Sequence, residues 1–150
     1  METRKNQYGT KLDAEIVRLF LLHMDAYSWN KSSHRLETAL LYLLELDTPE
    51  DHQVKEIYLE VAIRTRCSYL AAERSLRYAV RKIWESYPDE CSELFYRSSV
   101  RCACPPVSMF FMLFYAANER DSIKKWIESI ESRSLSIYAI PYLNLFYSLK

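Results

Sequence analysis

The chain has 150 residues, in which 20 Lys and Arg residues balance 20 Asp and Glu residues, so the formal net charge is zero. This excludes a protein coated all over in positive charge, but it does not exclude a local basic face. Hydrophobic residues make up 49% of the chain, which is enough to bury a core and too much for a disordered protein. The single glycine, Gly9, excludes Gly-rich phosphate loops and dinucleotide-binding fingerprints. The composition predicts a compact all-α domain of six to seven helices.

The N-terminal part is predicted to be a polar leader followed by an amphipathic helix. Residues 1–11 are mostly polar and are expected to be flexible. Thr10 and Asp13 fit a capping box, and apolar residues then recur at helical spacing as far as His23. We therefore expect the first helix to begin just after Thr10.

The next predicted elements are a linker over residues 25–31 and two helices. Ser32 or Ser33 can cap the first of these helices, which carries leucines on one face. The clearest helix start in the chain follows, with Thr48 as the cap and Pro49 at the first helical position. This helix is expected to continue to residues 65–66.

A second helix should follow the one from Pro49 after only a few residues, with Ser68 as its cap and residues 87–88 as its end. Ala62 supplies the small residue that is needed where two such helices cross. Residues 49–86 therefore fit a helix-turn-helix, whose second helix would lie in the major groove of DNA.

The rest of the chain is predicted to hold three further helices and a tail. A short helix over residues 89–96 precedes an irregular loop over residues 97–106. Residues 106–118 are apolar all round, which predicts a central buried helix, and residues 121–132 are amphipathic. Residues 134–150 form an apolar tail that contains Pro141.

Charge is distributed unevenly over the predicted helix-turn-helix. Residues 63–82 contain six basic residues and one acidic residue, a net charge of +5, whereas residues 43–60 have a net charge of −5. Concentrated positive charge is typical of a surface that contacts the phosphate backbone. Five of the six cations are arginines, which can bind guanine through two hydrogen bonds. The alternative is that these residues are solvated charges on an exposed helix.

The same stretch resembles a known family. Ala62, the run Glu73-Arg74-Ser75-Leu76-Arg77-Tyr78-Ala79-Val80 and Trp84 resemble the DNA-binding effector domain of the master sporulation transcription factor of spore-forming Gram-positive bacteria. A second match follows at Leu94-Phe95 and at residues 105–110. The resemblance covers about residues 12–118. It implies a six-helix fold with a central helix-turn-helix, and sequence-specific binding to short DNA boxes by subunits paired head to tail.

The resemblance and the charge pattern together predict the contact residues. The expected base contacts are Glu73, Arg74, Arg77 and Tyr69. The expected phosphate contacts are Arg64, Arg66, Ser68, Arg81, Lys82 and Arg101.

Three departures from the family pattern change the expectations. The family's effector normally follows a phosphorylatable receiver domain, which this chain has no room for, so we expect no control by aspartyl phosphate. Cys104 stands where the family's loop carries a Lys. Residues 119–150 are expected to be an additional helix and tail beyond the family's end, which could pack on the domain or form a dimer interface.

The cysteines and histidines give little support for a metal site or for catalysis. Cys102 and Cys104 have no matched second pair, so free thiols are expected, with a redox-sensing pair as the alternative. His23, His34 and His52 are expected at the surface or at helix ends. No arrangement of a nucleophile and a base is recognisable. We expect no cofactor, no metal and no enzymatic activity.

The sequence thus predicts a transcription regulator that binds double-stranded DNA, without a small-molecule substrate. No secretion signal or membrane span is recognisable, so we expect a cytoplasmic, nucleoid-associated protein. The alternative is a non-enzymatic protein-interaction module derived from the same fold that no longer reads DNA.

Overall fold

The computed structural model describes residues 2–26 and 30–134, and it confirms an all-α fold, without strands in these two stretches. The elements are α1 (Glu2–His23), α2 (Lys31–Glu45), the 3₁₀-helix η1 (Pro49–Asp51), α3 (Val54–Thr65), α4 (Tyr69–Ser86), α5 (Pro88–Tyr96), α6 (Val107–Glu119) and α7 (Ser122–Ser134). None of these helices is both long enough and apolar enough to span a membrane. The tail predicted beyond α7 lies outside the described residues.

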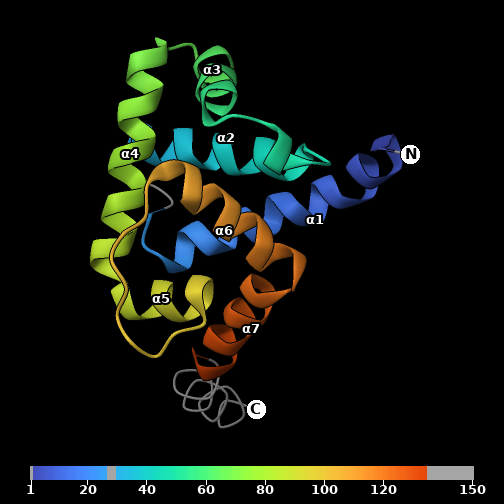
Figure 1. The fold of residues 1–150 in the computed structure, drawn as a ribbon. Coiled ribbons are helices and arrows are strands. Elements are labelled where there is room, and N and C mark those ends of the chain that lie inside the picture. Colours follow the sequence, from blue (N-terminus) through green and yellow to red (C-terminus); the bar gives the residue numbers. More distant parts are fainter. Residues whose placement is uncertain (1, 27–29, 135–150) are drawn as a thin grey trace, which may run out of the picture.

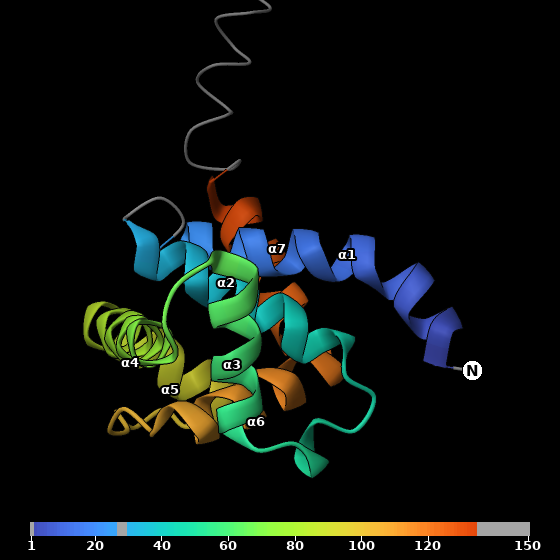
Figure 2. The same cartoon turned by 90° about the horizontal axis from the view of Figure 1, so that it is seen from above.

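Helix α2 lies at the centre of the arrangement and contacts α1, α3, α4 and α6. Figure 1 shows α4 standing along one side of the molecule, with α3 beside its first turns and α5 at its far end. Helix α6 crosses in front of α2, and the N-terminal half of α1 projects from the body (Figures 1 and 2). One long face of α4 is therefore left at the surface.

An aromatic cluster joins α1, α5, α6 and α7. The ring of Phe20 lies 5.1 Å from that of Phe114 and 6.0 Å from that of Trp126, between ring centroids. Phe95 and Phe110 pack edge to face at 5.3 Å. The four phenylalanines are buried, and their cluster forms the part of the core that lies away from α3.

The first helix begins earlier than predicted. Residues 2–11, which were predicted to be a flexible leader, are helical, and α1 starts at Glu2 instead of after Thr10. Extending a helix that is already nucleated adds one hydrogen bond per residue, so the polar residues before Thr10 can continue the helix.

The start of α2 also differs from the prediction. The cap is Asn30, whose side-chain oxygen accepts a hydrogen bond from the backbone N–H of Ser32 at 2.9 Å. Ser33, one of the two predicted caps, is buried on the inner face of the helix instead. Asn is as good a cap as Ser, and it comes first in the chain.

The predicted helix start at Thr48 and Pro49 is wrong in detail. Pro49 begins a single turn of 3₁₀-helix, and Thr48 makes no side-chain capping bond. His52 is extended and interrupts the helical geometry, so that α3 begins only at Val54. The predicted end of this helix, the start of the next one after Ser68 and the short helix after it are confirmed.

Helix α6 was predicted to be buried on all sides, and this prediction is wrong. Its inner face is buried and consists of Phe110, Phe111, Phe114 and Ala117, whereas the side chain of Met109 is 47% exposed. The outer face remains apolar at Met109, whose sulfur accepts a hydrogen bond from the hydroxyl of Tyr96 at the end of α5 at 3.3 Å. Helix α7 is amphipathic, as predicted, with Ile123 and Ile127 buried.

Candidate nucleic-acid interface

Helices α3 and α4 are joined by a turn of three residues. Arg66 ends α3 in the left-handed conformation, with φ 55° and ψ 50°. The backbone N–H of Cys67 donates to the carbonyl of Ala62 at 3.0 Å, and Ala62 is buried where the two helices meet. Left-handed geometry costs a residue other than glycine about 1–2 kcal/mol, which the surrounding packing has to offset.

The first turn of α4 is fixed from two sides. The hydroxyl oxygen of Ser68 accepts a hydrogen bond from the backbone N–H of Ala71 at 3.0 Å, which caps the helix. The ring of Tyr69 packs edge to face against that of Tyr58 on α3, with centroids 5.8 Å apart. The start of α4 therefore has a defined position relative to α3.

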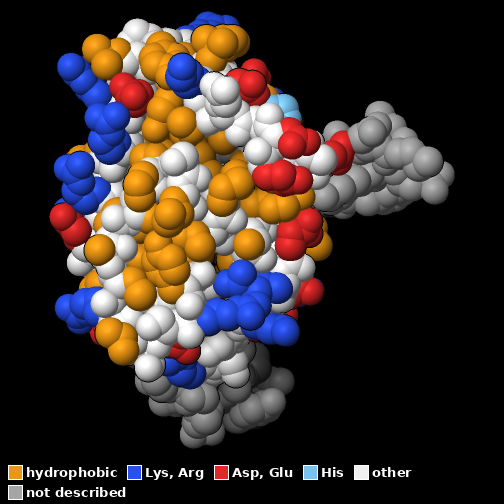
Figure 3. All heavy atoms as spheres, viewed as in Figure 1, with side chains coloured by type: hydrophobic (Ala, Val, Ile, Leu, Met, Phe, Trp, Pro, Cys, Tyr) orange, Lys and Arg blue, Asp and Glu red, His pale blue; other side chains and the backbone are white. Residues whose placement is uncertain are grey.

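The outer face of α4 is long, exposed and mostly basic. Leu70, Arg74, Arg77 and Arg81 follow one another at intervals of four, three and four residues, which places them on one face. All four are exposed. Figure 3 shows basic side chains gathered along the edge that α4 forms. We call these four residues the α4 stripe.

Opposite the α4 stripe, the inner face of α4 is buried. Its residues are Ala72, Ser75, Leu76, Ala79, Val80, Ile83 and Trp84. Because one face of α4 is buried and the opposite face is exposed, the rotation of α4 about its axis is fixed, and so is the direction in which the α4 stripe points.

Among the predicted contact residues, several cations have no carboxylate partner. Arg66, Arg74, Arg81 and Lys82 are exposed and form no ion pair with any described residue. Arg77 is 55% exposed at its side chain and pairs with Glu73 at 3.2 Å. Positive charge on this side of the molecule is thus largely unneutralised.

Glu73 lies beside the α4 stripe, on the side toward α3. Its side chain is 26% exposed, and its negative charge adds to burial in raising the pKa of Tyr58. Tyr69 lies on the same side through its contact with Tyr58. Two of the four predicted base contacts therefore flank the stripe, and Arg74 and Arg77 belong to it.

Arg64 is engaged within the protein. Its guanidinium donates to both carboxylate oxygens of Glu45, at 3.1 and 3.2 Å, and to Glu60 at 2.8 Å. It also lies over the ring of Tyr42, 5.0 Å from the centroid. The hydrogen bond to Glu45 is the main reason that the pKa of Arg64 is raised. These contacts tie α3 to α2 and use the donors that a phosphate would need.

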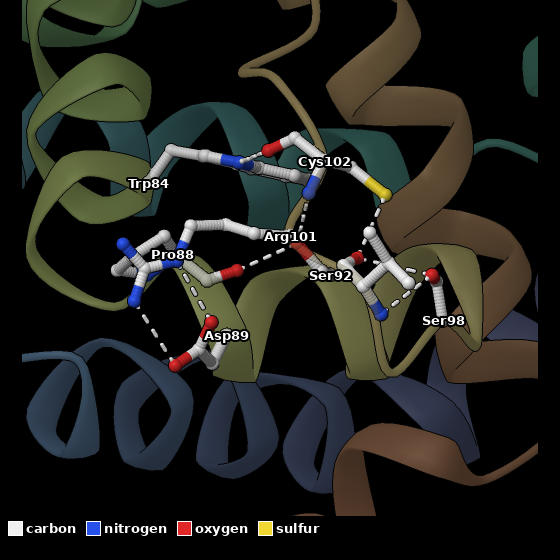
Figure 4. Close-up of polar contacts among 8 residues, drawn as sticks. Trp84, Pro88, Asp89, Ser92, Ser98, Arg101 and Cys102 are labelled. Carbon is white, nitrogen blue, oxygen red and sulfur yellow. Dashed lines mark hydrogen bonds and ion pairs between the residues drawn. The ribbon is translucent and has the colours of Figure 1, made fainter.

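Arg101 lies at the far end of α4 and is also paired. Its guanidinium donates to both carboxylate oxygens of Asp89, at 2.9 and 3.2 Å, and lowers the pKa of that carboxyl group (Figure 4). Asp89 is in the first turn of α5, so this pair is a full helix length, about 27 Å, from Ser68. Arg101, one of the predicted phosphate contacts, is therefore half of a neutral pair.

The loop that carries Arg101 is held against α4 and α5. The indole N–H of Trp84 donates to the carbonyl of Cys102 at 2.8 Å, and the hydroxyl of Ser92 accepts from the backbone N–H of Cys102, also at 2.8 Å (Figure 4). These bonds explain why a loop without regular structure keeps one path.

A pocket of about 390 Å³ beside the α4 stripe was not predicted. It lies between α3, α4 and the first turn of α6, and Arg77 and Arg81 form part of its wall together with Cys104 and Ser108. Nothing in the sequence places the loop cysteine next to these arginines, since the contact depends on how α6 packs across α2.

The cysteines and histidines form no chemical centre in the described part of the chain. All four thiols are free, and burial is the main cause that raises the pKa of Cys91 and of Cys104. His52 contacts Glu56 at 2.6 Å and His23 contacts Glu131 at 3.4 Å. No group of three or more metal-ligating side chains occurs among the described residues.

Comparisons of the chain with family profiles, with curated protein sequences and with solved structures find no significant match.

Proposed function

We propose that this protein binds double-stranded DNA through α4, as a transcription regulator without catalytic activity. The observation that carries the proposal is the α4 stripe on a capped and rigidly packed helix. A helix of this kind fits the major groove, and arginines on its outer face reach base edges. The resemblance of residues 12–118 to the sporulation effector domain supports the same reading.

We divide the proposed contact residues into two groups. Arg74 and Arg77 are proposed to read bases, with Glu73 and Tyr69 beside them. The groups proposed for the phosphate backbone are Arg66, Ser68, Arg81 and Lys82. We assign Arg64 and Arg101 to holding the fold, because each donates two or more hydrogen bonds to carboxylates, whereas Arg77 has a single contact with Glu73. Each phosphate contact is expected to steepen the salt dependence by about 0.9 in log–log slope.

The proposal is tested by fluorescence anisotropy on duplex DNA. A site is first selected from a random duplex library, and its affinity is compared with that of a scrambled duplex over a salt series. Arg74→Ala and Arg77→Ala are each expected to lose about 1–3 kcal/mol of binding free energy and to relax the sequence preference. Lys124→Ala, an exposed cation on α7, is the matched control and should bind like the wild type.

Two results would contradict the proposal. Folded wild-type protein that fails to bind any duplex at low salt would exclude DNA as the partner. If Lys124→Ala loses as much affinity for DNA as Arg74→Ala and Arg77→Ala do, α4 has no special role in binding.

A second candidate function, a protein-interaction module, is favoured by one observation. The outer face of α6 carries no charge before Glu119 in its last turn, with Met109 and Ala116 exposed and Met112 and Leu113 half-buried. Figure 3 shows hydrophobic side chains over the middle of this face of the molecule. Failure of the DNA experiment would make this face the next surface to test.

A further inference from the structure

The first turn of α4 is apolar, although it is the part of the helix that would lie deepest in the groove. Tyr69, Leu70 and Ala71 stand there, and the first side chain that can form a bidentate hydrogen bond to a base, Arg74, comes one turn later. In a major-groove complex the N-terminal residues of the second helix contact base edges. The proposed site therefore begins with an apolar contact.

Leu70 is the residue of this turn that leads the α4 stripe. Its side chain is 51% exposed, whereas the ring of Tyr69 is held against Tyr58 on α3. Ala71 offers only a methyl group and is half-buried. Leu70 shares its face with Arg74, four residues later, and with Arg77, seven residues later. An exposed leucine is common on protein surfaces, but this one stands on the face that carries the base-reading arginines.

Major-groove chemistry limits what such a leucine can recognise. The edges of guanine, cytosine and adenine present hydrogen-bonding groups, and the thymine 5-methyl group is the one apolar group. A leucine placed over a polar edge would remove water from groups that it cannot bond, which is unfavourable. Contact with a methyl group buries apolar surface on both partners instead.

We propose that Leu70 reads a thymine through its 5-methyl group, so that the preferred DNA site contains an essential thymine next to the bases read by Arg74 and Arg77. This rests on the proposed DNA-binding function. Leu70 and Arg74 are separated by about 6 Å along the helix axis, and base pairs are about 3.4 Å apart, so the thymine lies within about two base pairs of the base read by Arg74.

The test removes the methyl group from the DNA and the side chain from the protein separately. Each thymine of the selected site is replaced in turn by deoxyuridine, which lacks only the 5-methyl group. The affinity of each duplex is measured with the wild type, with Leu70→Ala and with Leu22→Ala. Leu22 on α1 is the matched control, because its side chain is also 51% exposed.

One deoxyuridine substitution is expected to weaken wild-type binding about three- to five-fold, the effect of roughly one buried methyl group. The same substitution should have no effect on Leu70→Ala and the full effect on Leu22→Ala. Both variants should keep the helical circular dichroism spectrum, because both leucines are half exposed.

Different failures have different meanings. Suppose that the wild type prefers its selected site. If no deoxyuridine substitution weakens its binding, or if the substitution weakens the binding of Leu70→Ala equally, the thymine proposal is wrong and DNA binding stands. If no duplex is preferred over the scrambled one, the proposed sequence-specific function itself fails, and the role of Leu70 fails with it.

Discussion

Residues of the same type have different roles in this protein according to their neighbours. Arg64 and Arg66 are separated by one residue, yet Arg64 is held by two carboxylates and a ring, and Arg66 has no carboxylate within ion-pair distance among the described residues. A guanidinium that is already bound within the protein has to give up these bonds before it can bind a phosphate. An exposed guanidinium has no such cost, so only Arg66 is available.

Substituting the two arginines by glutamine should separate stability from binding. Arg64→Gln is expected to lower the free energy of unfolding by about 1 kcal/mol, because partly exposed ion pairs are weak and two carboxylates lose their partner. Its affinity for DNA should stay within about two-fold of the wild type. Arg66→Gln should leave stability unchanged and reduce the salt slope of DNA binding by about 1. Urea unfolding and anisotropy titrations measure the two effects, and a reversed pattern would refute the assignment.

At the scale of the elements, capping decides where the helices of the candidate interface begin. Ser68 was recognisable as a cap because it stands alone between two helical patterns. Asn30 was missed because two serines follow it, and the sequence does not show that Ser33 is buried in the core. Thr48 and Pro49 carry a strong helix-start pattern, but the extended His52 ends that helix after one turn.

Removing the cap of α4 should destabilise the protein modestly. Ser68→Ala leaves the N–H of Ala71 without its acceptor and is expected to cost about 1 kcal/mol in the free energy of unfolding. Ser99→Ala, at an exposed loop position, serves as the control and should change stability by less than about 0.5 kcal/mol. Thermal and urea unfolding would report equal losses in both variants if the cap contributed nothing.

For the molecule as a whole, the aromatic cluster supports α4 at its C-terminal end. Phe114 contacts the rings of Phe20, Phe95 and Phe110, which belong to α1, α5 and α6. Phe95 also stacks on Trp84 near the end of α4, with ring centroids 6.0 Å apart. The position of the α4 stripe thus depends on packing at the C-terminal end of α4 and in the cluster beyond it.

Phe114→Ala should therefore destabilise the whole domain. A large cavity in a close-packed core is expected to lower the free energy of unfolding by about 3–5 kcal/mol, a large part of the total stability of a domain of this size. Met109→Ala on the same helix is the control and should cost less than about 1 kcal/mol, because Met109 is 47% exposed. Similar losses for the two variants, measured by urea unfolding, would show that the cluster is not the centre of the core.

The all-α class, most helix positions and the division of α4 into a buried and a basic face can be predicted without the structure, because they follow from composition, caps and helical periodicity. The sequence could not determine which cations are available. The ion pairs of Arg64 with Glu45 and of Arg101 with Asp89 join residues 19 and 12 positions apart, and no local pattern encodes such contacts. The open outer face of α6 has the same origin, since an apolar helix is covered only where other elements reach it. These features depend on which helices pack side by side, so they become visible only in the folded molecule.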